Sequence, residues 1–226
     1  MQWHPWIKQT LLNSRDGYFL VKRGLAKGLY IEEDFEHGLR TCFGLYEREL
    51  IPYLRSLISV GDCCYDIGAS NGYYTFMCGK LSKGRVYDFE TEPDRIQALE
   101  KTLQYNRLDA TKYSFTQAFI DKETNTAERK LALDDFVSQG HPAPNFVKMD
   151  IEGAEYNALL GLRRTLSENR LKMAIETHGK DIEAQCIELL ESLNYKVTII
   201  DKAKYFQETR PVFHNRWLVV EPGRSV

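Results

Sequence analysis

The stretch Tyr-Asp-Ile-Gly-Ala-Ser-Asn-Gly at residues 65–72 decides the fold, because it joins a short apolar strand to a helix through a glycine turn. Residues 63–67 have the apolar character of a strand buried on both faces, and residues 73–77 open a helix. Gly68 and Gly72 lack a Cβ, so the turn can adopt positive φ angles and a ligand can approach the main chain closely. The stretch therefore predicts a strand-turn-helix unit of an α/β sheet.

The turn itself allows three interpretations. Asp66, two residues before Gly68, suits a cofactor with a ribose and a charged tail, such as S-adenosylmethionine. Residues 68–72 also match the G-x-S-x-G elbow of a hydrolase, with Ser70 as the nucleophile. The third interpretation is purely structural, since any doubly wound domain has similar turns.

Length, charge and cysteine content narrow the class of protein. The 226 residues suffice for one domain with a sizeable core. The formal net charge of -2 gives no electrostatic case for nucleic acid, and no run approaches the 18 apolar residues of a membrane span. The N-terminus lacks a signal-peptide core and the five cysteines are an odd number, so we expect a cytoplasmic protein with reduced thiols.

Strand-like and helical patterns alternate after the turn. The expected strands are residues 63–67, 85–90, 112–119, 145–150, 171–177, 195–200 and 217–220, and one helix is expected over residues 154–166. Five β-α units followed by two consecutive strands predict a Rossmann-like, class I methyltransferase fold. This is an α/β fold whose seven-stranded, mostly parallel sheet ends in an antiparallel hairpin and has helices on both faces.

The pattern also suggests two parts of the chain. Residues 1–45 do not repeat it, and we expect them to be an N-terminal extension that covers the acceptor site. Residues 46–226 are expected to form the domain that binds S-adenosylmethionine.

Acids end the first two predicted strands. In an open parallel sheet, ligands bind beyond the carboxyl ends of the strands. Asp66 ends the first strand and Glu90 the second, where an acid commonly accepts hydrogen bonds from the ribose hydroxyls of a nucleoside. We therefore expect Glu90 to hold a ribose.

The segment KMDIEGAE at residues 148–155 concentrates charge at the end of the fourth strand. Lys148 interrupts an apolar strand, where an unpaired ammonium is costly, so it should reach a carboxylate or the mouth of the site. Asp150 ends the strand. Glu155 is expected only to stabilise the positive N-terminus of the following helix.

Glu176 and His178 lie two residues apart at the end of the fifth strand and share one face. If the fourth and fifth strands are neighbours, these two residues converge with Asp150, and Lys148 completes the catalytic set. We expect His178 or Asp150 to be a general base, with Glu176 orienting the imidazole. In a variant of this hypothesis, Asp150, Glu176 and His178 hold Mg²⁺.

Four segments together resemble the FkbM-type methyltransferases. They are the turn at residues 66–74, the second strand end at residues 89–93, Leu-Asp-Asp at residues 133–135, and residues 148–155. The resemblance implies S-adenosylmethionine-dependent methylation of an oxygen, on a hydroxyl of a sugar, a glycan or a secondary metabolite. Thr91 departs from the pattern, where a proline is frequent, and residues 1–42 and 201–216 match nothing in it.

From these patterns and the resemblance together we expect twelve cofactor-binding residues. They are Asp66, Gly68, Ala69, Ser70, Asn71, Gly72, Tyr73, Glu90, Ala118, Phe119, Asp134 and Asp150.

Two alternative functions, from other classes of protein, remain. A noncatalytic module could bind the cofactor and use the aromatic residues Trp3, Trp6, Tyr18 and Phe19 to hold a partner. A serine hydrolase is disfavoured, because no His-Gly-Gly-Gly loop precedes Gly68 to form an oxyanion hole.

Overall fold

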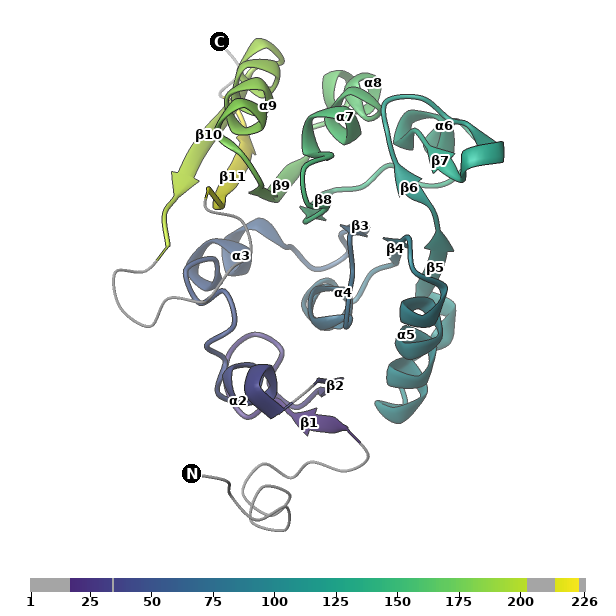
Figure 1. Cartoon of the computed structure of the whole chain (residues 1–226), viewed down its shortest axis with the longest axis vertical. Coiled ribbons are helices and arrows are strands. Elements are labelled where there is room, and N and C mark those ends of the chain that lie inside the picture. Colours follow the sequence, from purple (N-terminus) through teal and green to yellow (C-terminus); the bar gives the residue numbers. More distant parts are fainter. Residues whose placement is uncertain (1–16, 34, 203–213, 224–226) are drawn as a thin grey trace.

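The computed structural model describes residues 17–33, 35–202 and 214–223, and a seven-stranded sheet forms its centre (Figure 1). The strand order is β10-β11-β9-β8-β3-β4-β5. The bounds are β3 Cys64–Ile67, β4 Val86–Glu90, β5 Tyr113–Gln117, β8 Phe146–Met149, β9 Lys172–Thr177, β10 Tyr195–Ile200 and β11 Arg216–Pro222. The five strands from β3 to β9 pair in parallel, and β11 is antiparallel to both β9 and β10. The predicted fold class is confirmed.

Helices cover both faces of this sheet. The helices α3 (Ile51–Leu57), α4 (Tyr73–Ser82) and α5 (Pro93–Tyr105) share one core cluster with it. On the opposite face lie α6 (Leu133–Ser138), α7 (Glu155–Leu160), α8 (Arg163–Glu168) and α9 (Lys180–Ser192), around a second cluster. In Figure 1 the first group lies below the strands and the second above them. We call the first surface of the sheet the α4 face.

The described part of the predicted N-terminal extension packs on the α4 face. Its elements are β1 (Tyr18–Leu20), β2 (Tyr30–Glu32) and α2 (Phe35–Phe43), with β1 antiparallel to β2. Leu25 and Ile31 are buried in the same core cluster as Phe76 of α4. Residues 17–33 and 35–45 therefore share a core with the sheet.

The helix expected over residues 154–166 is in fact two helices, because the chain turns at Gly161. A Cβ at Gly161 would overlap the carbonyl oxygen of Asp121, so only glycine fits this close approach. Asp134 stabilises the break between the two helices. Its main-chain N–H donates to the main-chain oxygen of Gly161 (2.7 Å). Its carboxylate accepts from the main-chain N–H groups of Arg164 (2.8 Å) and Thr165 (2.9 Å). Asp134 thus caps α8.

The strand expected over residues 112–119 is also divided. After β5, the short strand β6 (Phe119–Ile120) leaves the main sheet and pairs in parallel with β7 (Lys130–Leu131). Single turns of 3-10 helix at Ala110–Lys112 and Thr126–Glu128 precede β5 and β7. The main-chain N–H of Ala118 donates to the main-chain carbonyl oxygen of Glu90 (3.0 Å). Ala118 and Phe119 therefore lie just beyond the carboxyl end of β4.

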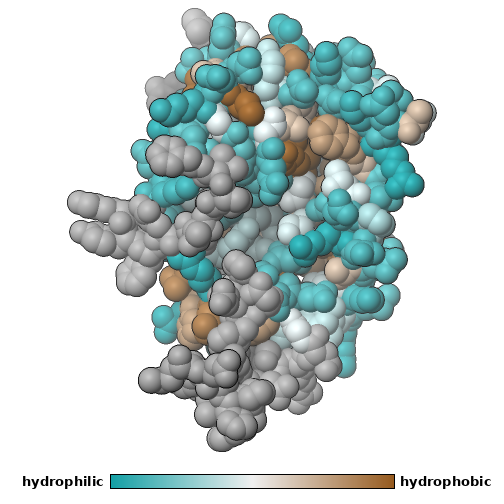
Figure 2. Space-filling model, viewed as in Figure 1, coloured by the Kyte–Doolittle hydropathy of each residue, from teal (hydrophilic) through white to brown (hydrophobic). Residues whose placement is uncertain are grey.

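The coloured surface in Figure 2 is mostly hydrophilic, with small apolar patches between the polar residues. The exposed large apolar side chains of the described residues are Leu39, Phe43, Leu45, Val60, Phe119 and Ile199. In the part of the chain that the structure describes, none of the helices has both the length and the apolar character needed to cross a membrane.

Candidate active site

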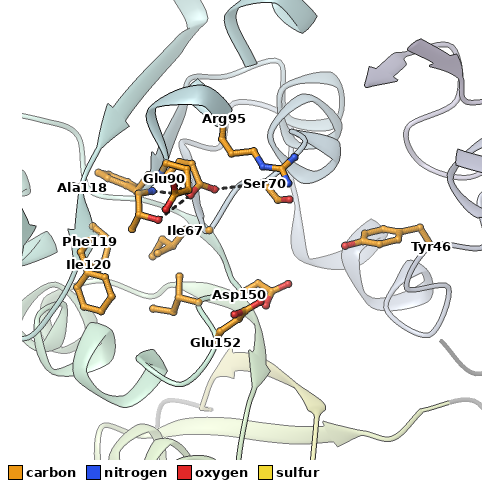
Figure 3. Close-up of a pocket in the computed structure, with 15 residues that line it drawn as sticks. Tyr46, Ile67, Ser70, Glu90, Arg95, Ala118, Phe119, Ile120, Asp150 and Glu152 are labelled. Carbon is orange, nitrogen blue, oxygen red and sulfur yellow. Dashed lines mark hydrogen bonds between the residues drawn. The ribbon is translucent and has the colours of Figure 1, made fainter. Parts of the chain in front are cut away.

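A cavity of about 760 Å³ opens at the carboxyl ends of β3, β4 and β8 (Figure 3). This is the edge at which open parallel sheets bind ligands, and the volume is typical of a small-molecule site. Six of the twelve predicted cofactor-binding residues line it: Gly68, Ser70, Glu90, Ala118, Phe119 and Asp150.

The glycine turn between β3 and α4 forms one wall of the cavity. Gly68 and Gly72 have φ angles of +83° and +81°, as expected, and Ser70 also has a positive φ, of 49°. A Cβ at Gly68 would overlap the carbonyl oxygen of Asp150 and lie 2.9 Å from its carbonyl carbon. Gly68 is therefore needed where the turn passes the end of β8.

Glu90 is held rigidly at the end of β4. Its Oε2 accepts from the main-chain N–H of Ser70 (2.9 Å), and its Oε1 accepts from the main-chain N–H of Thr91 (2.7 Å). Oε1 also accepts from the Thr91 hydroxyl (3.2 Å) and from the main-chain N–H of Glu92 (3.3 Å). Oε2 accepts only from Ser70 among the described residues, so Oε2 is the oxygen that keeps an acceptor position for a ligand hydroxyl. Figure 3 shows Glu90 beside Ser70 at the cavity wall.

The other six predicted residues do not line the cavity: Asp66, Ala69, Asn71, Gly72, Tyr73 and Asp134. Asp66 was expected at a strand end, but it lies inside β3 and is only 1% exposed. Its side chain points to the α4 face, where it accepts a hydrogen bond from Thr75 (2.7 Å). The expectation that Asp66 reaches the ligand edge is wrong, because the strand continues past it to Ile67.

The remaining turn residues hold protein segments together. Asn71 donates to Glu33 of the N-terminal segment (2.5 Å). A Cβ at Gly72 would come within 2.6 Å of the Leu99 side chain, so this glycine permits the packing of α4 against α5. Ala69 and Tyr73 are buried in the core.

Two buried carboxyl groups share one hydroxyl beneath the site. The Oγ1 of Thr75 lies 2.7 Å from Asp66 Oδ2 and 2.8 Å from Asp88 Oδ2. A hydroxyl has one proton to donate, so the second contact requires a proton on one of the carboxyl groups. Burial raises the pKa of Asp66 to about 6 and raises the pKa of Asp88 well above its usual value. The pair therefore holds a proton near neutral pH.

We expect Asp88→Asn to stabilise the protein at alkaline pH, because the amide supplies donor hydrogens at every pH. A carboxyl group with a raised pKa favours the fold fully below its unfolded pKa, and this contribution is lost as the pH rises through the folded pKa, which burial raises well above its usual value for Asp88. The free energy of unfolding of the variant should exceed that of the wild type by about 1 kcal/mol at pH 8 and by less at pH 5. Chemical unfolding at the two pH values measures this; a variant less stable at both would contradict the shared proton.

Asp150, Glu176 and His178 converge beside the cavity, as the sequence predicts. One ligand atom from each lies within 4.8 Å of the others. The His178 Nε2 is 3.6 Å from Asp150 Oδ1 and 3.6 Å from Glu176 Oε1. The cause is the parallel pairing of β8 with β9, which brings the two strand ends to one edge. Asp150 is the member that lines the cavity.

Glu155, and not Glu176, orients the imidazole of His178. Glu155 Oε1 lies 2.6 Å from His178 Nδ1, and the Glu155 side chain is completely buried. Glu176 instead accepts from Trp217 Nε1 (3.1 Å) and from Asn215 Nδ2 (2.5 Å). Burial alone would lower the pKa of His178, but the hydrogen bond to Glu155 and the nearby carboxylates outweigh it and raise that pKa.

Lys148 reaches a carboxylate, as the sequence predicts. Its side chain is 1% exposed, and its Nζ lies 3.6 Å from Asp150 Oδ2. The same ammonium lies 4.6 Å from the centre of the Tyr74 ring on α4, a distance at which the ring face attracts a cation. Lys148 therefore holds one oxygen of Asp150 while the other faces His178.

Nine of the fifteen residues that line the cavity are not among the predicted cofactor-binding residues, and Arg95 and Tyr46 are two of them. Arg95 lies in the first turn of α5 and reaches the cavity from the side of Glu90 and Ser70. Tyr46 lies on the opposite side in Figure 3 and packs edge-on against Tyr73, with the ring centres 5.1 Å apart. The spacing after Pro93 indicates a helix at Arg95, but no pattern at Tyr46 indicates a binding residue.

The structure does not favour a serine hydrolase. The Ser70 main-chain N–H is bonded to Glu90, but no described residue makes a hydrogen bond with the Ser70 hydroxyl. A nucleophilic serine needs a base within hydrogen-bonding reach. Among the described residues, none is placed to activate Ser70.

The strand order, the cavity at the carboxyl edge and the acid at the end of β4 define a class I, Rossmann-like methyltransferase fold. Residues 105–214 match the model of the methyltransferase FkbM domain, so the resemblance seen in the sequence is confirmed.

Known proteins agree with this assignment. The hexuronic acid methyltransferase AglP of Haloferax volcanii is 25% identical over 153 residues, which cover 59% of this chain and 63% of the relative. A methyltransferase FkbM from Methylobacillus flagellatus has a TM-score of 0.59 at 22% identity, over 82% of this chain and 52% of that one. A Streptococcus mutans protein in complex with SAH has a TM-score of 0.54 at 11% identity, over 75% and 93%. The chain thus spans less than two thirds of the length of the first two.

Proposed function

We propose that this protein is an S-adenosylmethionine-dependent methyltransferase that acts on a hydroxyl group of a sugar, a glycan or a secondary metabolite. The observation that carries the proposal is the cavity between the Gly68 turn and Glu90, at the carboxyl edge of a methyltransferase-type sheet. The match of residues 105–214 to the FkbM domain supports the same reaction class.

The residues of the cavity fit S-adenosylmethionine. Glu90 offers a fixed carboxylate to the two ribose hydroxyls. Gly68 and Ser70, in the turn beside Glu90, also line the cavity. Ala118 and Phe119 provide an apolar wall beyond Glu90 that suits an adenine ring. Bound there, the cofactor would supply an electrophilic methyl group carried on a sulfonium.

The chain has to position the acceptor and remove its proton. An aliphatic hydroxyl is a poor nucleophile near neutral pH, so alignment and deprotonation are the two catalytic tasks. Asp150 lines the cavity, and its Oδ1 lies 3.6 Å from His178 Nε2. These two observations support an acceptor site beside Asp150. We assign the activation of the acceptor hydroxyl to the cluster of Asp150, Glu176 and His178.

Segments outside the sheet contribute to the cavity and to the cluster of Asp150, Glu176 and His178. Tyr46 forms the wall opposite Glu90, and Asn71 ties the cofactor turn to Glu33. The region 201–216 lies mostly outside the described residues, but its described end brings Asn215 to Glu176. We propose that residues 1–45 and 201–216 shape the acceptor pocket. A sugar acceptor is supported by the Haloferax relative, whose name specifies a hexuronic acid.

We expect Glu90→Gln to weaken S-adenosylmethionine binding about tenfold, because it replaces a charged acceptor of two hydroxyl groups with a neutral amide. Isothermal titration with S-adenosylmethionine measures the change. Glu100→Gln, an exposed residue on α5, is the matched control and should bind like the wild type.

A transfer assay with radiolabelled methyl groups across hydroxylated sugars, glycans and metabolites tests the reaction. Labelling of an acceptor that Glu90→Gln reduces would support the proposal. Binding of the donor without transfer to any acceptor would favour the noncatalytic module, and a wild type that does not bind the donor would contradict both.

A further inference from the structure

We infer that Asp150, Glu176 and His178 form a binding site for a divalent transition-metal ion with one imidazole and two carboxylate ligands. Its catalytic consequence rests on the proposed function, but the site itself does not.

One atom of each residue faces a common point. His178 Nε2 lies 3.6 Å from both Asp150 Oδ1 and Glu176 Oε1. The His178 side chain is 93% buried, yet its Nε2 makes no hydrogen bond with any residue that the structure describes. A distance of 3.6 Å exceeds that of a normal N–H···O hydrogen bond. It matches the separation of about 3.4 Å between two ligands that are each about 2.1 Å from a tetrahedral ion.

The other polar atoms of the cluster are held from outside. The His178 Nδ1 bonds to Glu155, and Asp150 Oδ2 faces Lys148. Glu176 Oε2 accepts from Trp217. Glu176 Oε1, the proposed ligand atom, also accepts from Asn215 Nδ2 (2.5 Å), and its second lone pair is left for the ion. Metal-binding histidines usually donate their second ring N–H to a carboxylate, which fixes the tautomer and the ring orientation. Glu155 makes that contact here, so Nε2 is the atom available to an ion.

The donor set favours a transition metal over the Mg²⁺ suggested by the sequence. Magnesium prefers oxygen ligands in octahedral geometry and retains several waters, whereas imidazole suits ions such as Zn²⁺ and Fe²⁺, and carboxylates suit Mn²⁺. Three protein ligands leave at least one coordination position of such an ion open, and Asp150 connects the site to the cavity that it lines. An ion there could bind the acceptor hydroxyl and lower its pKa.

Metal binding can be tested without donor or acceptor. The full chain is stripped with a chelator, dialysed, and titrated with MnCl₂ by electron paramagnetic resonance and with ZnCl₂ or MgCl₂ by calorimetry. We expect one Mn²⁺ or Zn²⁺ per chain, binding at least tenfold tighter than Mg²⁺. His178→Ala and Asp150→Asn should each weaken it about a hundredfold, and His141→Ala, which removes a histidine stacked on Phe136, should not.

A spectroscopic measurement on the wild type keeps the test independent of variant folding. The bound Mn²⁺ should show ¹⁴N coupling from one imidazole in pulsed electron paramagnetic resonance. Absence of saturable Mn²⁺ and Zn²⁺ binding, Mn²⁺ without ¹⁴N coupling, or undiminished binding in folded His178→Ala would overturn the site. A protein that binds the metal but transfers no methyl group would leave the site standing and remove the proposed function.

Discussion

Replacing Gly68 with alanine should destabilise the protein by about 3 kcal/mol and weaken cofactor binding, because two penalties coincide at this position. The φ of +83° costs an alanine about 1–2 kcal/mol, and the added Cβ would overlap the Asp150 carbonyl oxygen. Relief of the overlap must displace either the cofactor turn or the end of β8. The free energy of unfolding and the S-adenosylmethionine dissociation constant measure the two effects.

Gly140→Ala is the control that separates the two penalties. Gly140 has a φ of +96°, but a Cβ there meets no heavy atom within 4 Å. Its substitution should therefore cost about 1–2 kcal/mol from backbone strain alone. Equal destabilisation by the two substitutions would show that the close approach of the turn to Asp150 does not matter.

Features that depend on local pattern could be predicted from the sequence. The alternation of strands and helices predicts the seven-stranded sheet, because parallel strands need crossover helices and the final two strands lack one. The same logic brings Asp150 to Glu176 and His178, since neighbouring parallel strands end at one edge. Glu90 follows from its place at the end of β4.

Features that depend on strand register, or on contacts between distant parts of the chain, could not be predicted from the sequence. A strand end in the sequence is uncertain by one residue, and that residue decides whether Asp66 faces the ligand edge or lies under α4. The break at Gly161 depends on the approach of Asp121, 40 residues earlier in the chain. Glu155 has every local property of a helix N-terminal acid, and only the tertiary fold brings it to His178.

The role of Glu155 gives the second large expected effect. Glu155→Gln should lower kcat and the affinity for Mn²⁺ by about 10- to 100-fold, because the neutral amide holds His178 Nδ1 more weakly and no longer raises the basicity of the ring. The dissociation constant of S-adenosylmethionine should not change, since Glu155 does not line the cavity. Steady-state kinetics, Mn²⁺ titration and donor binding on the same preparation measure the three quantities.

The separation of these quantities distinguishes a positioning residue from a residue needed only for folding. A purely structural loss at the first turn of α7 would lower the free energy of unfolding and donor binding together, whereas a change at His178 lowers kcat and metal affinity alone. Glu168→Gln, an exposed residue on α8, makes the same chemical change away from the cluster and should leave all three values at those of the wild type. If Glu155→Gln retains full kcat and full Mn²⁺ affinity, its bond to His178 serves only to neutralise a buried carboxylate.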